Sequence, residues 1–181
     1  DMRFKGVRVD LEHAANLKKN LIIRENKIIS KIKELTGINV EIHAARSIAK
    51  AFDKLKLPYD RTEKSNEPSF TKNFLQNHPH ELARSIADAR EINKAHTTFI
   101  DSITKHSAKG RIHADINQIR SDQGGTVTGR FSMSNPNLQQ IPARHPEIGP
   151  MIRSIFIPEE NTTWGSFDYS QQEPRILVHY A

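Results

Sequence analysis

The chain has 181 residues, of which 36% are hydrophobic, and its 27 Lys and Arg residues outnumber its 21 Asp and Glu residues. The net charge of +6 and the sequence pI near 9.6 favour a polyanionic partner, either nucleic acid or an anionic membrane, although an ordinary basic protein has the same balance. The lack of Cys excludes disulfide bonds and thiolate metal sites, and no apolar run is long enough to cross a bilayer.

The first part of the chain has the apolar periodicity of amphipathic helices. Asp10 is a candidate N-cap for a helix that ends at Gly37, and a second helix must end before Pro58. The expected buried positions of these two helices are Leu11, Ala14, Leu17, Leu21, Ile28, Ile32, Leu35, Ile48, Phe52 and Leu55.

A polar stretch over residues 59–68 predicts a loop. We expect a short helix through Phe70 and Phe74 after it, and then a long helix from about Pro79. The expected buried side of the long helix carries Leu82, Ile86, Ala89, Ile92, Phe99 and Ile103. The pattern predicts antiparallel helices over residues 1–110.

After Gly110 the pattern becomes extended. Apolar and polar residues alternate over 112–116, as in a strand, and residues 121–150 are rich in Gly, Pro, Asn, Ser and Gln. Loops of that length are usually functional or disordered. Further strands are expected over 152–157 and 164–167.

The sequence therefore predicts an α+β protein with a helical region over residues 1–110 and the first strands and helix of a second domain over 111–181. The basic residues change kind at the same boundary, because no Lys follows Lys109. Arg suits phosphates and base edges, although drift in composition gives the same pattern. The Arg residues beyond the boundary are Arg111, Arg120, Arg130, Arg144, Arg153 and Arg175.

The segment 126–142 combines a guanidinium, hydroxyls and side-chain amides on a backbone shaped by Gly and Pro. Such donors can bind phosphates and the minor-groove acceptors that all base pairs share. The alternative is a polar loop whose amides cap neighbouring turns, and composition alone favours that alternative.

The segment 167–175 is expected to lead from a strand through a turn into a helix. Asp168, at the strand end, is a suitable ligand for Mg²⁺, or it is only an acid near a helix N-terminus. Ser170 and Glu173 have the spacing of a capping box, which gives Glu173 a structural explanation, and Pro174 fits a first helical turn.

The nine His residues are scattered without a metal-ligand spacing, so we expect surface or satisfied histidines. No phosphate-binding Gly-rich loop is present, and Gly124 and Gly125 indicate a turn.

In this order and spacing, the two segments resemble the family A DNA polymerases, the DNA polymerase I class. TGRFSMSNPNLQQIP is similar to the family's TGR…PNLQ-IP segment, and DYSQQEPR is similar to its motif A, usually DYSQIELR. GVRVD, KELTG, AFDKLKLP and TTFIDSI resemble the family's thumb, and GRIHADINQ resembles the start of its palm. SDQGG before TVTGR is similar to phage-type members.

The resemblance implies a DNA-directed DNA polymerase that adds deoxynucleotides to a primer 3′ end by two-metal phosphoryl transfer, in replication or repair. Its implied partners are primer/template DNA and a deoxynucleoside triphosphate (dNTP), and its implied cofactor is a pair of Mg²⁺ ions. Asp168 matches the aspartate that binds both ions, with help from the Tyr169 carbonyl. Glu173 matches the steric-gate glutamate that excludes a ribose 2′-hydroxyl, and Arg130 matches the arginine that reaches the minor groove. The remaining implied site residues are Ser170 and Gln171 for the nucleotide, and Asn137, Gln139, Gln140, Lys94, Thr97, Thr98, Ser69 and Thr71 for DNA.

The sequence departs from the family pattern in several places. Gln172 and Pro174 replace the usual Ile and Leu, and His43 falls where a thumb Ser is frequent. The finger helix, the second catalytic aspartate and the preceding 3′–5′ exonuclease domain have no counterpart. Since the sequence starts with Asp1 and stops at Ala181 inside the expected helix, we expect a fragment. That fragment should not polymerise alone and should work with the remaining fingers and palm residues of the same polymerase.

Two alternatives stay open from the sequence. One is a non-catalytic DNA-binding module from a split or decayed polymerase gene, and the other is a regulatory domain in which Asp168 is structural. Nothing in the sequence resembles a signal peptide, so we expect the cytoplasm of a bacterium or of a phage-infected host, without membrane association.

Overall fold

The structure is a computed structural model that describes residues 2–122, 124–143 and 145–181, without the side chain of Met2. Gln123 of the SDQGG segment and Arg144 lie outside the described residues. The helices are α1 (Met2–Lys5), α2 (Leu11–Thr36), α3 (Ala45–Lys54), α4 (Lys72–Asn77), α5 (Glu81–Lys94), α6 (Asp101–His106), α7 (Ile148–Arg153) and α8 (Gln172–Tyr180), with a π-helix η1 (Ala95–Ile100) and a 3₁₀-helix η2 (Leu138–Gln140). The strands are β1 (Val7–Arg8), β2 (Asp60–Arg61), β3 (Pro68–Ser69), β4 (Ser107–Ala108), β5 (Arg111–Ile112), β6 (Asp115–Asn117) and β7 (Ser132–Ser134).

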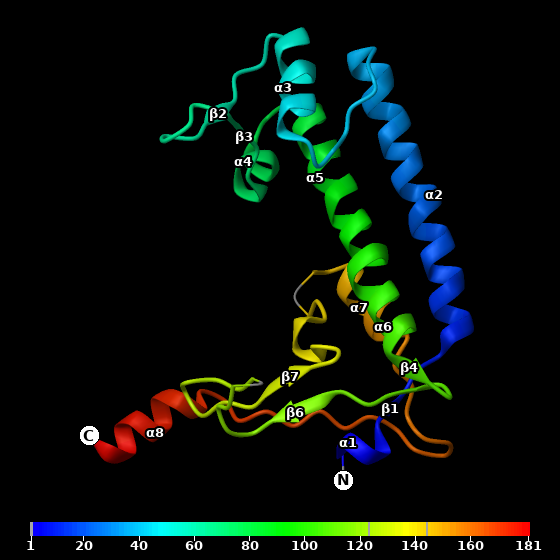
Figure 1. The fold of residues 1–181 in the computed structure, drawn as a ribbon, viewed down its shortest axis with the longest axis vertical. Helices are drawn as coiled ribbons and strands as arrows, with labels where there is room; N and C mark the ends of the chain where they lie inside the picture. The colour runs from blue at the N-terminus through cyan, green and yellow to red at the C-terminus, as the bar shows by residue number, and fades with distance from the viewer. Residues whose placement is uncertain (1, 123, 144) are drawn as a thin grey trace.

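The chain has the outline of an L in Figure 1. One arm consists of α2 and α5 running antiparallel, with α3, α4 and the β2–β3 hairpin at its far end. The other arm contains β6, β7 and α8, and α8 extends away at its end. The mixed α+β architecture that the sequence predicts is confirmed. None of the helices in the described ranges combines the length and the apolarity that a bilayer span needs.

Helix α2 begins and ends where its capping residues predict. The Asp10 side chain accepts a 2.8 Å hydrogen bond from the His13 amide, which satisfies one of the unpaired donors of the first turn. Gly37 adopts φ 67° and donates its amide to the Lys33 carbonyl, a left-handed cap that Gly adopts without steric cost. The predicted second helix is also present as α3.

The predicted long helix consists of α5, η1 and α6 in direct succession, so its six central residues are π-helical. Phe70 precedes α4 rather than joining it, because Thr71 caps that helix by accepting from the Phe74 amide.

Two hydrophobic cores fill the molecule. The first lies at the far end of the helical arm and is built around the fully buried Phe52, Leu75 and Ile86. The second lies where the arms meet and includes Val9 and Ile155, from opposite ends of the chain. The second core therefore takes residues from both sides of the boundary that we predict near Gly110.

The strands are short and antiparallel. They form a three-stranded sheet in the order β1-β5-β4 and two pairs, β2-β3 and β6-β7. The strand predicted over 112–116 is broken into β5 and β6, because these two strands pair with different partners. The predicted loop over 59–68 contains the β2–β3 hairpin.

Two predicted strands are wrong. The first half of 152–157 belongs to helix α7 and the turn after it, where Ile152 and Ile155 are both fully buried. Their separation of three residues is a helical spacing, which the apolar run concealed. No strand is assigned to 164–167, and its residues are exposed, because β-prone residues form a strand only where a neighbouring strand pairs with them.

Candidate functional site

Asp168 lies in a hollow of about 490 Å³ at the start of α8. The hollow is also lined by four other predicted site residues, which are Arg130, Tyr169, Gln171 and Glu173. The side chain of Arg130 enters the hollow from the loop before β7. Two segments that the sequence singled out separately therefore meet here.

The carboxylate of Glu173 forms an ion pair with the guanidinium of Arg130, and both side chains are well exposed. The capping-box expectation is wrong, since α8 starts one residue later than Ser170 requires. Its N-cap is Gln171, which has φ 52° and no capping hydrogen bond from its side chain. Pro174 is the third helical residue and lies within the first turn, where backbone donors lack intrahelical partners. The structure therefore leaves Glu173 available to face the hollow.

The donors that this hollow offers to a cation are oxygen atoms, which suits a hard ion such as Mg²⁺. Asp168 and Tyr169 both line it, so the Asp168 carboxylate is a candidate ligand and the Tyr169 carbonyl is the one that the resemblance implies, whereas Glu173 is engaged by Arg130. Within the described residues, no group of three His, Asp or Glu side chains could hold a metal ion. The chemistry of these residues suits part of the ligand set of a magnesium ion. The remaining ligands of such an ion must come from substrate phosphates or from other residues.

The loop that carries Arg130 is held by its own polar side chains. The Thr126 hydroxyl donates to the Arg130 carbonyl over 2.7 Å. Asn137 caps η2 by accepting from the Gln139 amide, and the Gln139 side chain donates to the Phe131 carbonyl. Asn137 and Gln139 thus have the turn-capping role that the alternative interpretation of this segment proposed.

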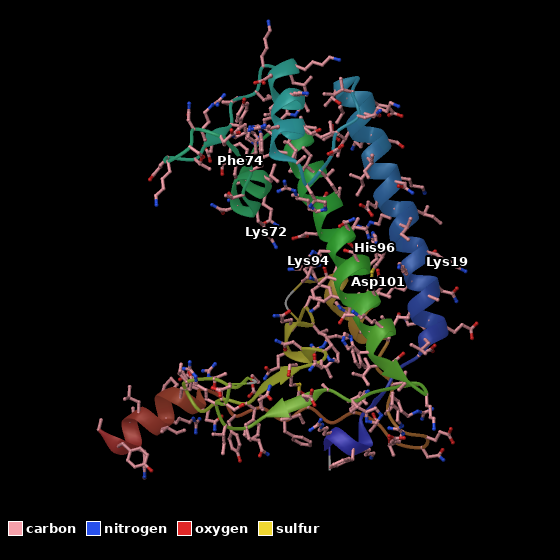
Figure 2. The ribbon with its side chains drawn as sticks, viewed as in Figure 1. Lys19, Lys72, Phe74, Lys94, His96 and Asp101 are labelled. Carbon is pink, nitrogen blue, oxygen red and sulfur yellow. The ribbon has the colours of Figure 1, made fainter. Side chains whose placement is uncertain are left out.

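A second group of predicted DNA-binding residues meets between η1 and η2. Thr98 from η1 and Asn137 and Gln140 from the η2 segment line one small hollow of about 80 Å³. Lys94 and Lys72 lie on the inner side of the L in Figure 2. Lys94, Thr98 and Gln140 are all exposed.

The other predicted DNA-binding residues have local roles. Thr97 donates its hydroxyl to the Asn93 carbonyl over 2.8 Å. Thr71 caps α4, and Ser69 pairs with Asp60 in the hairpin at the far end of the helical arm. The structure therefore does not bring Ser69 and Thr71 together with the residues around η1.

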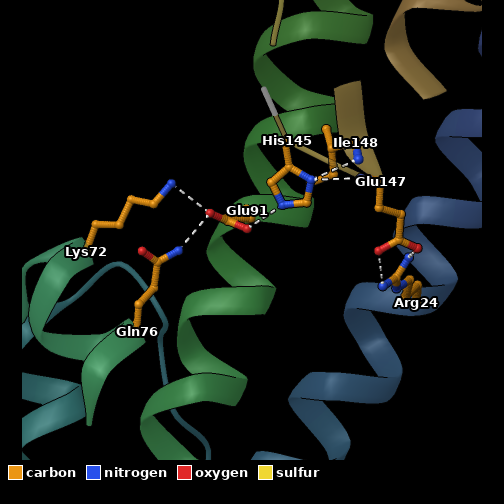
Figure 3. A network of polar contacts seen from close by, with 7 residues as sticks. All are labelled: Arg24, Lys72, Gln76, Glu91, His145, Glu147 and Ile148. Carbon is orange, nitrogen blue, oxygen red and sulfur yellow. Dashed lines mark hydrogen bonds and ion pairs between the residues drawn. The ribbon is translucent and has the colours of Figure 1, made fainter. Parts of the chain in front are cut away.

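A polar network joins the helical arm to α7 (Figure 3). Glu91 accepts from Lys72 and lies 2.9 Å from Nε2 of His145, whose Nδ1 accepts the Glu147 and Ile148 amides. Burial alone would raise the pKa of Glu91, but the hydrogen bonds from Lys72 and His145 outweigh it and hold that pKa below its ordinary value.

On the other side of α7, Arg24 donates to both carboxylate oxygens of Glu147 (Figure 3). That hydrogen bonding lowers the pKa of Glu147 below its ordinary value, against a small opposing effect of burial. The start of α7 is thus held to α5 by a hydrogen bond between His145 and Glu91 and to α2 by an ion pair between Glu147 and Arg24.

Glu25 and His96 belong to no predicted site, although the structure buries both. Their side chains are about one-tenth exposed, and His96 Nδ1 has no hydrogen-bond partner within the described chain. The expectation that every histidine is exposed or satisfied is therefore wrong for His96. A sequence signal for Glu25 exists, because it lies four residues after Leu21 and three before Ile28, in the apolar stripe of α2.

The chain is similar to known polymerases along nearly its whole length. A family model described as DNA polymerase family A matches residues 11–181. The chain is 34% identical over 190 residues to a DNA-directed DNA polymerase of Pseudomonas phage M6, covering 99% of the chain and 28% of that protein. It is 33% identical over 184 residues to the thermostable DNA polymerase I of Thermus aquaticus, covering 98% of the chain and 21% of that protein.

A solved structure has the same fold. The POL domain of Pol1 from M. smegmatis, in complex with DNA primer-template and dNTP, superposes with a TM-score of 0.72 at 24% identity. The match covers 90% of the chain and 28% of that protein. The chain spans less than a third of the length of these curated relatives and of the solved structure.

Proposed function

Because the chain belongs to DNA polymerase family A, we propose that it forms the thumb, residues 1–110, and the first part of the palm, residues 111–181, of a DNA-directed DNA polymerase. The reaction is the template-directed addition of deoxynucleotides to a primer 3′ end. The observation that carries the proposal is the hollow where Asp168 and Glu173 meet Arg130. A free carboxylate that can bind Mg²⁺ is one part of the arrangement that metal-assisted phosphoryl transfer to a primer uses.

Primer/template DNA lies along the inner side of the L in this proposal. Lys94, at the end of α5, and Thr98, in η1, contact phosphates, and Gln140 reaches the duplex from across the small hollow that it lines with Thr98. Lys72 adds positive charge on the same side (Figure 2). Contacts of this kind fix the position of a duplex without reading its sequence.

At the hollow beside α8, Asp168 and the Tyr169 carbonyl are the groups that would hold Mg²⁺. Such an ion, when bound, would supply activation of the primer hydroxyl and neutralisation of the triphosphate charge. Ser170 and Gln171 lie beside the incoming nucleotide, and Glu173 faces its sugar. Arg130 orients Glu173 through their ion pair and reaches the minor groove at the primer terminus.

The alternative is a non-catalytic DNA-binding module. One observation favours it. Because Glu173 is paired with Arg130, Asp168 has the only carboxylate left free among the described residues that line the hollow. One carboxylate does not organise two ions, so the 181-residue chain should bind duplex DNA without extending a primer.

Primer extension separates the two functions. We expect Asp168→Asn in the complete polymerase to abolish incorporation and to leave primer/template affinity within about twofold, because only the metal ligand is lost. Glu160→Gln is the matched control, since Glu160 is an exposed acid away from the hollow. Unchanged incorporation by Asp168→Asn would show that Asp168 is structural, as in a regulatory domain, whereas a wild-type protein that binds primer/template without incorporating nucleotides would establish the non-catalytic alternative. Steady primer extension by the 181-residue chain would refute the prediction that it lacks part of its site.

A further inference from the structure

Glu25 is an acidic side chain buried in the middle of α2. It is 8% exposed, and both of its carboxylate oxygens are used by one neighbouring helix. Oε1 accepts a 2.9 Å hydrogen bond from Nδ2 of Asn93, at the end of α5. Oε2 lies 2.6 Å from Nε2 of His96, in η1. Since a carboxylate only accepts, the hydrogen of this contact belongs to His96 Nε2.

Asn93 extends this contact in two directions. Its side-chain oxygen lies 3.1 Å from Nε2 of His43, so a single amide orientation satisfies both His43 and Glu25. Its main-chain carbonyl accepts the hydroxyl of Thr97 over 2.8 Å. Asn93 therefore connects the buried carboxylate, through its side chain, with the exposed Thr97, through its main chain.

The same contacts lie at the start of the π-helix. His96 is its second residue, and the His96 carbonyl accepts the Asp101 amide five residues later. Figure 2 shows His96 pointing from this segment toward α2. A π-helical turn inside an α-helix is rare and occurs mostly at functional sites. The surrounding structure must specify its register, because an ordinary α-helical turn competes with it.

An acidic residue is not needed at position 25 for the hydrophobic packing of α2. Leu21, Ile28 and Ile32 cover the rest of this face of α2, and an apolar residue at position 25 would avoid the cost of burying a charge. The His96 Nδ1 atom, buried without a partner in the described chain, adds to that cost. A buried polar pair of this kind contributes specificity of arrangement more readily than stability.

We propose that Glu25 is a positioning residue that fixes the π-helical register of Ala95–Ile100 through Asn93 and His96. It thereby sets where Lys94, Thr97 and Thr98 meet the phosphate backbone of primer/template DNA. The second statement rests on the function proposed above, whereas the first concerns the free chain and stands apart from it.

Hydrogen exchange of the free chain tests the register. Glu25→Gln keeps the size of the side chain but introduces an NH₂ group, which either opposes the NH₂ of Asn93 or forces the His96 proton from Nε2 onto the buried Nδ1, where no described group accepts it. We expect the Asp101 amide, which bonds to His96, to exchange about tenfold faster, as the loss of one hydrogen bond predicts. The control Glu34→Gln removes the same charge from an exposed position of α2 and should leave that rate unchanged. Equal rates in Glu25→Gln and wild type overturn the proposal.

Binding of a fluorescent primer/template duplex, followed by anisotropy over a range of KCl concentrations, tests the consequence. We expect Glu25→Gln to weaken binding about five- to tenfold. The slope of log K against log salt should fall by about one unit because Lys94 is displaced, and thermal destabilisation alone would not change this slope.

Glu25→Gln added to Thr97→Val should weaken binding less than the product of the single effects, because Glu25 acts through Thr97. Independent effects, or a wild-type response, overturn the positioning role. A wild-type chain that binds no duplex refutes the proposed function instead, and hydrogen exchange still decides the register.

A second variant tests the proposal if Glu25→Gln does not fold. The double substitution Glu25→Leu with His96→Leu replaces the buried pair by apolar side chains and should fold at least as stably as wild type. We expect this variant to melt cooperatively while its Asp101 amide exchanges faster and its duplex affinity falls. A double variant with the wild-type exchange rate and affinity would show that the pair is dispensable and would refute the inference.

Discussion

Glu91 is the side chain through which α4, α5 and α7 are connected, and replacing it tests how much that connection contributes to stability. Its Oε1 atom accepts from Lys72 at 2.8 Å and from Gln76 at 3.2 Å. Its Oε2 atom lies 2.9 Å from Nε2 of His145, which in turn holds the first amides of α7 (Figure 3). Glu91→Gln keeps the shape of the side chain and turns one acceptor into a donor.

The magnitude follows from the exposure of each partner. Lys72 is 71% exposed and contributes little, because water screens the pair. The contact with His145 is half-buried, and its loss costs about 1.5 kcal/mol, the lower end for a hydrogen bond to a charged group. Each kcal/mol corresponds to a shift of about 2–4 °C in Tm for a chain of this size. We therefore expect Glu91→Gln to lower Tm by about 3–6 °C at pH 7.

The effect should depend on pH in a defined direction. The folded-state pKa of Glu91 is below its ordinary value of 4.5, so its contribution is complete above that value and is lost as the pH falls through the folded pKa. The difference in Tm between wild type and Glu91→Gln should therefore shrink below pH 4.5.

Thermal unfolding followed by circular dichroism at pH 7 and at about pH 3 measures this difference. The control is Glu67→Gln, since Glu67 pairs with Arg46 in the exposed hairpin region and should change Tm negligibly. An equal loss of Tm at both pH values, or an equal loss in the control, would refute the assignment of the stabilisation to the Glu91 carboxylate.

Three further substitutions test single features of the fold. Asp10→Ala removes the cap that accepts from His13 and should lower Tm by the equivalent of about 1 kcal/mol, and an unchanged Tm would mean that water replaces the cap. Ile152→Ala leaves a cavity in the second core, since Ile152 is fully buried. It should reduce the free energy of unfolding, measured in urea, by about 2–5 kcal/mol, and a loss below about 1 kcal/mol would contradict that burial. Gly125→Ala should speed proteolysis of its loop, because φ is +101° and a Cβ would lie 2.6 Å from the Arg120 Cα; wild-type resistance would show that the loop has another conformation.

The sequence predicted well those features that depend on residues close to one another along the chain. Helix α2 has both predicted ends, because an Asp cap and a left-handed Gly act within one turn of their own position. Asp168 and Glu173 likewise line one hollow because they lie close together in the sequence, on the turn and the first residues of helix α8.

The failures concern contacts between distant segments. The segment 164–167 has the composition of a strand, but pairing depends on residues elsewhere in the chain. The capping box expected for Ser170 and Glu173 failed because α8 starts one residue later, and Glu173 instead pairs with Arg130 from a distant segment. The π-helix escaped prediction, since Ile92, His96 and Ile103 keep an α-helical spacing along it.

The two cores differ in how much of the chain must exist before each can form. Every buried residue of the first core lies between positions 32 and 89, and helices α3, α4 and α5 supply most of them. The second core requires Val9 to meet Ile155, and Val9 also forms a β-bridge with Phe156. Contacts between near neighbours form faster than contacts that close a long loop, and chains emerge from the ribosome from the N-terminus. We therefore expect the far end of the helical arm to fold during synthesis, while the amino end of α2 waits for α7 to be translated. Until then its apolar face remains exposed, and this is the stage at which a nascent chain most needs a chaperone.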